Sequence, residues 1–181
     1  MTILIKNRQI VADNWRLLDA AGAPGVSAND SGNLIVPLAL WRAHRESFLA
    51  RPGALGIQLE GHDEPETIAA DLDRFELVAI HFQQFADGRG YSLARLLRER
   101  YHYTRELRAV GDVLRDQLFY LSRVGFDAFA LRDDQDATEA LKAFADFSEG
   151  YQASVERPFP LFRRRLDGPP RVDQAAADQS H

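Results

Sequence analysis

The chain repeats a short apolar run followed by an amphipathic segment, and this alternation limits its fold more than any other feature. The runs typical of buried strands are 54–59, 76–82, 106–110 and 126–131. Each is followed by a segment with apolar side chains at the helical period, at 64–72, 92–101, 112–124 and 136–151. Four to five such strand–helix units predict an α/β fold with a largely parallel sheet and right-handed crossovers.

The length of the chain reduces the number of possible architectures further. A complete eight-unit β/α barrel usually takes about 250 residues, whereas this chain has 181. A doubly wound sheet and a partial β/α barrel both remain, since the pattern does not give the strand order. Ahead of the repeated units, residues 2–6 and 9–18 flank Asn7-Arg8 and predict an N-terminal β-hairpin. A strand at 34–36 and a helix at 38–50 follow, so we expect residues 1–157 to form a single α/β domain.

The composition changes after residue 157, where a C-terminal extension of residues 158–181 begins. Its final part is small and polar, and we expect that part to be disordered. Earlier in the extension, aromatic side chains precede a basic run, which suits docking on an acidic partner. The residues concerned are Phe159, Phe162, Arg163, Arg164 and Arg165. The alternative is that this segment lies back on its own domain.

Charge and residue types exclude several classes of protein. A formal net charge of -5 and a pI near 5.5 argue against a nucleic-acid binder, which usually carries a basic face. No apolar run approaches the ~18–20 residues of a membrane span, and the start lacks a secretory signal, so we expect a cytoplasmic protein with no membrane partner. The absence of cysteine excludes disulfides, thiolate catalysis and a cysteine-ligated iron–sulfur cluster within the chain. Redox chemistry would therefore need a partner protein or a bound organic cofactor, such as a flavin or a nicotinamide.

The polar loop after the strand at 76–82 is the first candidate binding site. It contains Asp87, Gly88, Arg89 and Gly90, followed by Ser92. The glycines can expose backbone N–H groups, Arg89 can offer its guanidinium fork to an anion, and the next helix would add its positive end. Phosphate, sulfite or a flavin phosphate would suit such a site. The alternative is a tight surface turn in which Asp87 bonds the local backbone, Ser92 caps the helix and Arg89 is solvated.

The loop after the strand at 106–110 repeats the change from strand to helix and is the second candidate site. Its residues are Gly111, Asp112 and Arg115. In a parallel sheet both loops lie at the same edge, so Arg89 and Arg115 are expected to converge on one anionic ligand. The alternative is that Asp112 caps its helix and Arg115 pairs locally with Asp116.

The sequence assigns no catalytic residue and no metal site. His81 lies in an apolar strand, where a buried and hydrogen-bonded histidine is a simpler interpretation than an acid–base catalyst. Three further histidines lack the spacing of metal ligands: His44, His62 and His102. A group of aspartates, Asp133, Asp134 and Asp136, lacks the rest of a calcium-loop pattern and fits helix capping better.

Three stretches taken together resemble one bacterial family. They are FADGRGYS at 85–92, ELRAVGDVLRDQ at 106–117 and GFDAF at 125–129. The order and the residues of these motifs resemble those of the family catalogued as domain of unknown function 934, over roughly residues 30–165. Genes of that family commonly accompany those of the assimilatory sulfite or nitrite reductase haemoprotein and of sulfate activation. Members are often labelled as oxidoreductases of sulfite reduction. The resemblance therefore implies a role in sulfur assimilation and supplies no catalytic residues.

Two functional hypotheses follow. The first is an accessory protein of assimilatory sulfite reduction that acts in contact with the sulfite or nitrite reductase haemoprotein. The second is an enzyme, a flavin- or nicotinamide-linked oxidoreductase that binds an anionic ligand at the Asp87–Arg89 and Asp112–Arg115 loops. An exposed edge strand would also allow a homodimer.

Overall fold

The computed structural model describes residues 3–19, 31–84, 87–142 and 144 of the chain. Within them, strands form one sheet in the order β2-β1-β8-β7-β6-β5-β4-β3. Their bounds are β1 (Ile3–Lys6), β2 (Gln9–Ala12), β3 (Trp15–Leu17), β4 (Asn33–Pro37), β5 (Leu55–Glu60), β6 (Phe75–Phe82), β7 (Glu106–Gly111) and β8 (Ala128–Phe129). From β3 to β8 each strand runs parallel to the next, while β1 is antiparallel to β2 and β8. The predicted α/β fold with a largely parallel sheet is confirmed.

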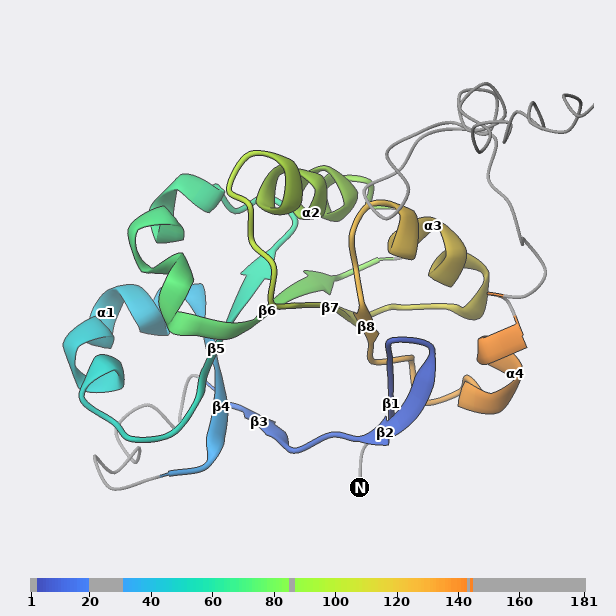
Figure 1. Cartoon of the computed structure of the whole chain (residues 1–181), viewed down its shortest axis with the longest axis horizontal. Coiled ribbons are helices and arrows are strands. Elements are labelled where there is room, and N and C mark those ends of the chain that lie inside the picture. Colours follow the sequence, from blue (N-terminus) through green and yellow to red (C-terminus); the bar gives the residue numbers. More distant parts are fainter. Residues whose placement is uncertain (1–2, 20–30, 85–86, 143, 145–181) are drawn as a thin grey trace, which may run out of the picture.

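The sheet curls into a half-barrel with helices along its outer, convex side (Figure 1). The helical elements are α1 (Leu38–Leu49), the 3₁₀ helix η2 (Pro65–Arg74), α2 (Arg89–Glu99), the 3₁₀ turn η3 (Arg115–Gln117), α3 (Leu118–Arg123) and α4 (Ala137–Lys142). A doubly wound sheet would reverse its strand order partway. Strands β3 to β8 lie side by side in chain order, so that alternative is wrong and the partial barrel is the architecture.

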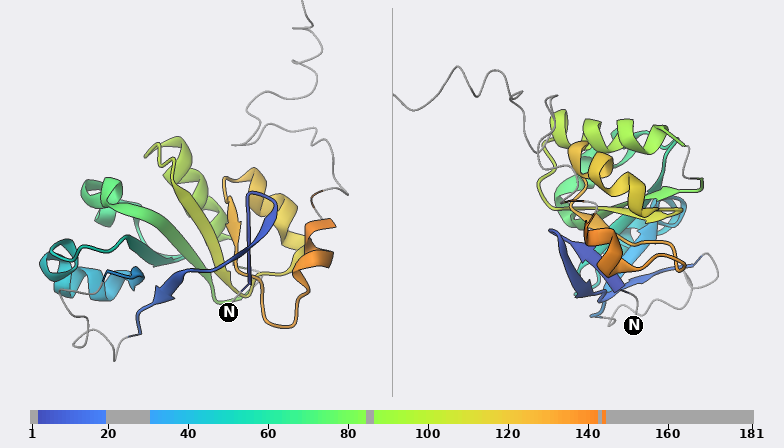
Figure 2. Two further views of the ribbon diagram at one scale, coloured as in Figure 1. Left: turned by 60° about the horizontal axis from the view of Figure 1, so that its bottom comes forward. Right: turned by 90° about the vertical axis from the view of Figure 1, so that its right-hand side faces the viewer.

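The N-terminal hairpin is confirmed for β1 and β2 but not for the residues after them. Trp15 pairs in parallel with Asn33 of β4, at the edge of the sheet opposite β2. Only Asp13 and Asn14 separate the two edge strands along the chain. Because three residue steps span at most about 11 Å, the two edges lie close together there. Residues 9–17 thus cross the open side of the half-barrel as one extended run (Figure 2).

Several predicted elements have different limits in the structure. Helix α2 starts at Arg89 rather than at residue 92, and the helix predicted from residue 112 begins at Arg115 with a 3₁₀ turn. The strand predicted at 126–131 is reduced to Ala128–Phe129. The predicted helix at 136–151 corresponds to α4 in its first half. Its end, and the whole extension 158–181, lie outside the described residues.

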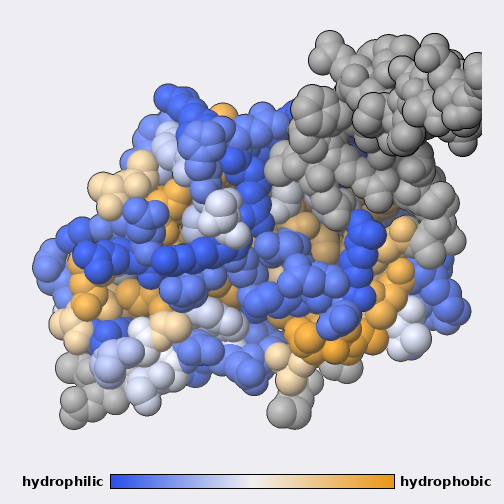
Figure 3. Space-filling view, in the orientation of Figure 1, coloured by the Kyte–Doolittle hydropathy of each residue, from blue (hydrophilic) through white to orange (hydrophobic). Residues whose placement is uncertain are grey.

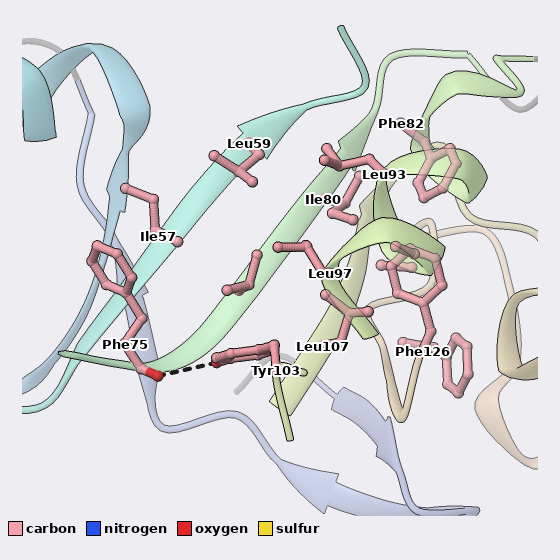
Figure 4. Packing of buried hydrophobic residues seen from close by; sticks show 14 of the residues in the cluster. Ile57, Leu59, Phe75, Ile80, Phe82, Leu93, Leu97, Tyr103, Leu107 and Phe126 are labelled. Atoms are coloured by element: carbon pink, nitrogen blue, oxygen red, sulfur yellow. Dashed lines mark hydrogen bonds between the residues drawn. The ribbon is translucent and has the colours of Figure 1, made fainter. Parts of the chain in front are cut away.

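The convex face of the sheet forms the main core against the helices. Ile80 of β6 and Leu107 of β7 point toward Leu93 and Leu97 of α2, and all four side chains are buried (Figure 4). At one end of this layer the Tyr103 hydroxyl donates to the Phe75 carbonyl over 3.1 Å. The other face of β6 is apolar as well, since Leu77 and Ala79 are fully buried there. Burial on both faces explains why the central strands are nearly continuous apolar runs in the sequence.

The concave face holds a charged cluster centred on Arg108 of β7, whose side chain is only 2% exposed. Its Nη1 donates to Asp13 over 2.8 Å, and its Nε donates to Glu106 over 2.8 Å. Lys6 of β1 donates to the other oxygen of Glu106 over 2.7 Å. Asp13 lies at the middle of the crossing run and also accepts the Trp15 backbone N–H over 3.1 Å. The cluster therefore fastens the crossing run to the central sheet.

The visible surface in Figure 3 is mainly hydrophilic, with hydrophobic side chains in separate patches. Among the described residues, the large apolar side chains that stay exposed are Ile10, Leu17, Leu96 and Tyr120. Ile10 and Leu17 belong to the edge strands β2 and β3, where an additional strand would pair, and the homodimer stays a prediction. In the part of the chain that the structure describes, every helix is too short or too polar to span a lipid bilayer.

Candidate functional site at the carboxyl edge

The carboxyl ends of the parallel strands meet at one edge of the half-barrel. Strand β5 ends at Glu60, β6 at Phe82 and β7 at Gly111, and these three strands are neighbours. In parallel α/β folds this edge is where ligands bind, because the loops that follow the strands converge there. Both predicted junctions begin at this edge, as the sequence indicated.

The first junction holds its own charges together. The Arg89 backbone N–H and Nε donate to Asp87 Oδ1 over 3.1 and 2.9 Å, and Nη2 donates to Oδ2 over 2.8 Å. This fork lowers the pKa of the Asp87 carboxyl from its usual 3.8 to about 2. The ion pair is therefore present above about pH 4 and is lost as the pH falls through about 2. Arg89 is thus paired within its own loop, while its side chain stays 62% exposed.

The remaining residues of this junction differ in how closely they pack, and their role in ligand binding stays a prediction. Gly88 is the N-cap of α2 and has open space where a side chain would begin. Gly90 is buried, and a Cβ there would lie 2.7 Å from the Phe82 ring. Ser92 is exposed within the first turns of α2 and is not its cap. Gly90 thus allows the helix to start close to the sheet.

The second junction is also internally paired. Asp112 accepts a hydrogen bond from Arg132 Nη1 over 2.8 Å and does not cap a helix, because η3 begins only after Leu114. The Arg115 backbone N–H donates to Gln135 over 3.3 Å. Arg89 packs beside Gly61 near β5, and the Arg115 backbone N–H contacts the segment after β8. The convergence of their side chains on one anionic ligand stays a prediction.

A side-chain contact connects the two junctions. Gln117 of η3 donates from Nε2 to the Tyr91 hydroxyl of α2 over 3.0 Å. The Tyr91 ring also lies 5.3 Å from the Phe82 ring, centroid to centroid. Burial raises the pKa of the Tyr91 hydroxyl, so this group stays neutral in the physiological range. The junctions are neighbours, as predicted, and aromatic and amide contacts join them.

The same edge holds a histidine–carboxylate pair that the sequence interpretation missed. His81 Nδ1 lies 3.0 Å from both carboxylate oxygens of Glu60, and Gln83 Nε2 donates to Glu60 Oε2 over 3.1 Å. With Nδ1 facing a carboxylate, the imidazole is held in one orientation and its Nε2 is left to accept or donate a proton. The sequence interpretation treated His81 as a buried structural residue. In the structure its side chain is 33% exposed.

The contact follows from the register in which β5 and β6 pair. Glu60 and His81 are register partners, and both lie at the carboxyl ends of their strands. Gly111 completes the arrangement from β7. It has a φ of +91°, and a Cβ there would lie 2.6 Å from His81 Cδ2. Gly111 was predicted as a loop residue that contacts a ligand. In the structure it is the last residue of β7, with the Phe82 carbonyl and the imidazole beside its Cα, and the ligand contact stays a prediction.

Next to Glu60 lies a cavity of about 290 Å³ between the start of α1 and the turn after β5. Its polar lining comprises Arg42, Gln58, Glu60, His62 and Asp63, and the first residues of α1 form the rest. Sequence reasoning missed these residues as a group because they come from two separate strand–helix units. The signal they share is a position in or just after the carboxyl-terminal half of the neighbouring strands β4 and β5.

Among the described residues there is no group of three or more His, Cys, Asp or Glu side chains placed to hold a metal ion. The predicted partner-binding residues Phe159, Phe162, Arg163, Arg164 and Arg165 lie outside the described residues. Their role stays a prediction.

The comparison with known protein families gives a match over most of the helix-covered sheet. A family described as "Bacterial protein of unknown function (DUF934)" matches residues 56–162, which is more than half of the chain. The matched region contains β5 to α4 and includes both junctions, Glu60 and His81. No curated protein matches the chain.

Proposed function

Because the chain belongs to the DUF934 family, we propose that it is an accessory protein of assimilatory sulfite reduction and that it acts at its carboxyl edge. The resemblance to this family implies an association with the genes of the sulfite or nitrite reductase haemoprotein, and this supports the accessory role. The Glu60–His81 pair beside a cavity supports action at the carboxyl edge, and it is the observation that carries the proposal. Its partner in this proposal is the reductase haemoprotein.

The carboxyl edge suits an accessory role because it offers both a fixed proton-exchanging group and open access. Glu60 and His81 have side chains that are 28% and 33% exposed, so each reaches solvent while its partner restrains it. A group oriented in this way can bind a small molecule or exchange a proton with it without prior rearrangement. The half-barrel supplies the rigid support, since both residues lie on paired strands.

Co-purification tests the proposed partner. A tagged copy of the chain, isolated from its native cells growing on sulfate as the sulfur source, is expected to elute with the reductase haemoprotein. The measurement is the visible absorbance of the eluate, together with the mass of the proteins in it. An eluate without haem absorbance, from a lysate rich in the reductase, would refute direct contact.

The flavin- or nicotinamide-linked alternative receives no specific support from the geometry. Its ligand was expected at two anion-binding loops, yet Asp87 pairs with Arg89 and Asp112 pairs with Arg132. The same purification separates the two hypotheses. A yellow protein that elutes without the reductase would favour the enzyme.

A further inference from the structure

The cavity beside Glu60 carries opposite charges on different walls. Arg42 reaches it from α1, while Glu60 and Asp63 reach it from the end of β5 and the turn that follows. No ion pair joins Arg42 to either carboxylate within the described residues, although all three line one cavity of about 290 Å³. Charges that share a cavity without contact leave room for a ligand between them.

The cationic wall lacks an acceptor. Its neighbour Arg45 is engaged by Asp71 and Glu46, whereas among the described residues Arg42 has no hydrogen-bond or ion-pair partner. A guanidinium binds a carboxylate best through two parallel N–H groups. The adjoining first turn of α1 has no side-chain cap, so its leading N–H groups are available to the same carboxylate. This wall therefore suits a ligand carboxylate.

The acidic wall keeps part of its acceptor capacity. Glu60 binds His81 and Gln83, and Asp63 Oδ2 accepts the Glu60 backbone N–H over 2.8 Å. Asp63 Oδ1 has no protein donor among the described residues. Two carboxylates facing one arginine disfavour a simple anion, because a second negative charge would be repelled. An ammonium group on the ligand would be attracted to this wall instead.

The size of the cavity and its apolar lining limit the class of ligand that it can hold. A volume of about 290 Å³ lies just below the range of about 300–1,000 Å³ that is usual for drug-sized ligands. Pro37, Leu38 and Ala39 give one side of the cavity an apolar surface. A molecule with a carboxylate and an ammonium on one carbon, and with a small side chain, matches the charges and the apolar side together.

We infer that this cavity binds a small zwitterion of the α-amino acid class, with Arg42 on its carboxylate and Asp63 on its ammonium. The inference rests on the proposed function, because it names the ligand class of the same carboxyl edge. It gives an accessory protein of sulfur assimilation a means to respond to an amino acid. It does not depend on contact with the haemoprotein.

Chemical-shift titration of the isotope-labelled full chain tests this inference. The probes are the L-amino acids one at a time, with acetate, ethylamine and sulfate as partial ligands. At least one amino acid is expected to bind more tightly than any partial ligand. Arg42→Gln and Asp63→Asn are each expected to weaken that binding about tenfold or more, since each removes a hydrogen bond to a charged group. Arg100→Gln is the matched control, because Arg100 is an exposed arginine at the C-terminal end of α2.

Each contrary outcome has a separate meaning. Binding of sulfate or acetate as tight as that of any amino acid would replace the zwitterion with a plain anion. Amino-acid binding that is unchanged in both variants would place the site elsewhere, and no binding at all would overturn the inference. None of these results depends on the reductase. A negative amino-acid titration would therefore not affect the co-purification result. A negative co-purification would likewise not affect the binding result.

Discussion

Replacing Arg108 with leucine is expected to lower the free energy of unfolding by about 3–5 kcal/mol, the usual cost of removing one partner from a buried ion pair. Arg108 is 2% exposed, and Glu106 beside it is 6% exposed. Without the guanidinium, the carboxylates of Glu106 and Asp13 remain on the concave face, and Lys6 offsets only the first of them. The crossing run between β2 and β3 also loses its attachment to β7.

Urea unfolding of the variant measures this effect. Arg95→Leu is the matched control, because Arg95 is exposed and makes an i,i+4 pair with Glu99, which is worth about 0.3–0.5 kcal/mol. Adding Asp13→Asn and Glu106→Gln to Arg108→Leu is expected to restore part of the loss, since neutral amides cost less to bury than unpaired carboxylates. An Arg108→Leu variant as stable as Arg95→Leu would contradict the account of the cluster.

Replacing Gly111 with alanine is expected to lower the free energy of unfolding by about 2–4 kcal/mol and to separate His81 from Glu60, because strain and overpacking add. A residue with a side chain at a φ of +91° is strained by about 1–2 kcal/mol. The new Cβ would also overlap the Phe82 carbonyl oxygen and lie 2.6 Å from His81 Cδ2, and overpacking of this kind costs about 1–3 kcal/mol. The imidazole is the neighbour that can move, so its contact with Glu60 is expected to break.

Gly88→Ala provides a matched control within the same candidate site. Gly88 has a φ of -70°, and no atom lies within 4 Å of the position that an alanine methyl group would occupy. Alanine there is therefore expected to be neutral or stabilising by up to about 1 kcal/mol. Unfolding in urea gives the stability of both variants, and the nitrogen shifts of the His81 ring report on its contact with Glu60. Equal behaviour of the two variants would show that Gly111 does not support the histidine.

The fold could be predicted from the sequence where an apolar run of residues corresponds to a buried strand. Strands β5, β6 and β7 are apolar runs between amphipathic segments, and they were placed to within a residue. Trp15–Leu17 was assigned to the hairpin because it continues the pattern of the residues before it. Its pairing with β4 depends on how far the sheet curls, which no local pattern contains. Strand β8 was predicted too long because Phe126 is apolar for packing reasons outside the ladder.

The candidate site was predicted in location but not in contacts. Asp87, Arg89 and Gly111 do lie at the carboxyl edge, since strand-to-helix junctions are visible in the sequence. Whether Arg89 faces a ligand or Asp87 is decided by side-chain geometry over a few ångströms. The Glu60–His81 contact joins residues that are 21 positions apart. It follows only from the register between two strands, which the sequence did not supply.

Growth of a deletion strain on sulfate as the sole sulfur source tests the central claim most directly. The strain is expected to grow slowly on sulfate and normally on cysteine, and the wild-type gene is expected to restore growth on sulfate. A gene with His81→Ala is expected to fail, while His44→Ala, which changes an exposed histidine on α1, is expected to succeed. Full restoration by His81→Ala, or a deletion strain with no defect on sulfate, would contradict the account.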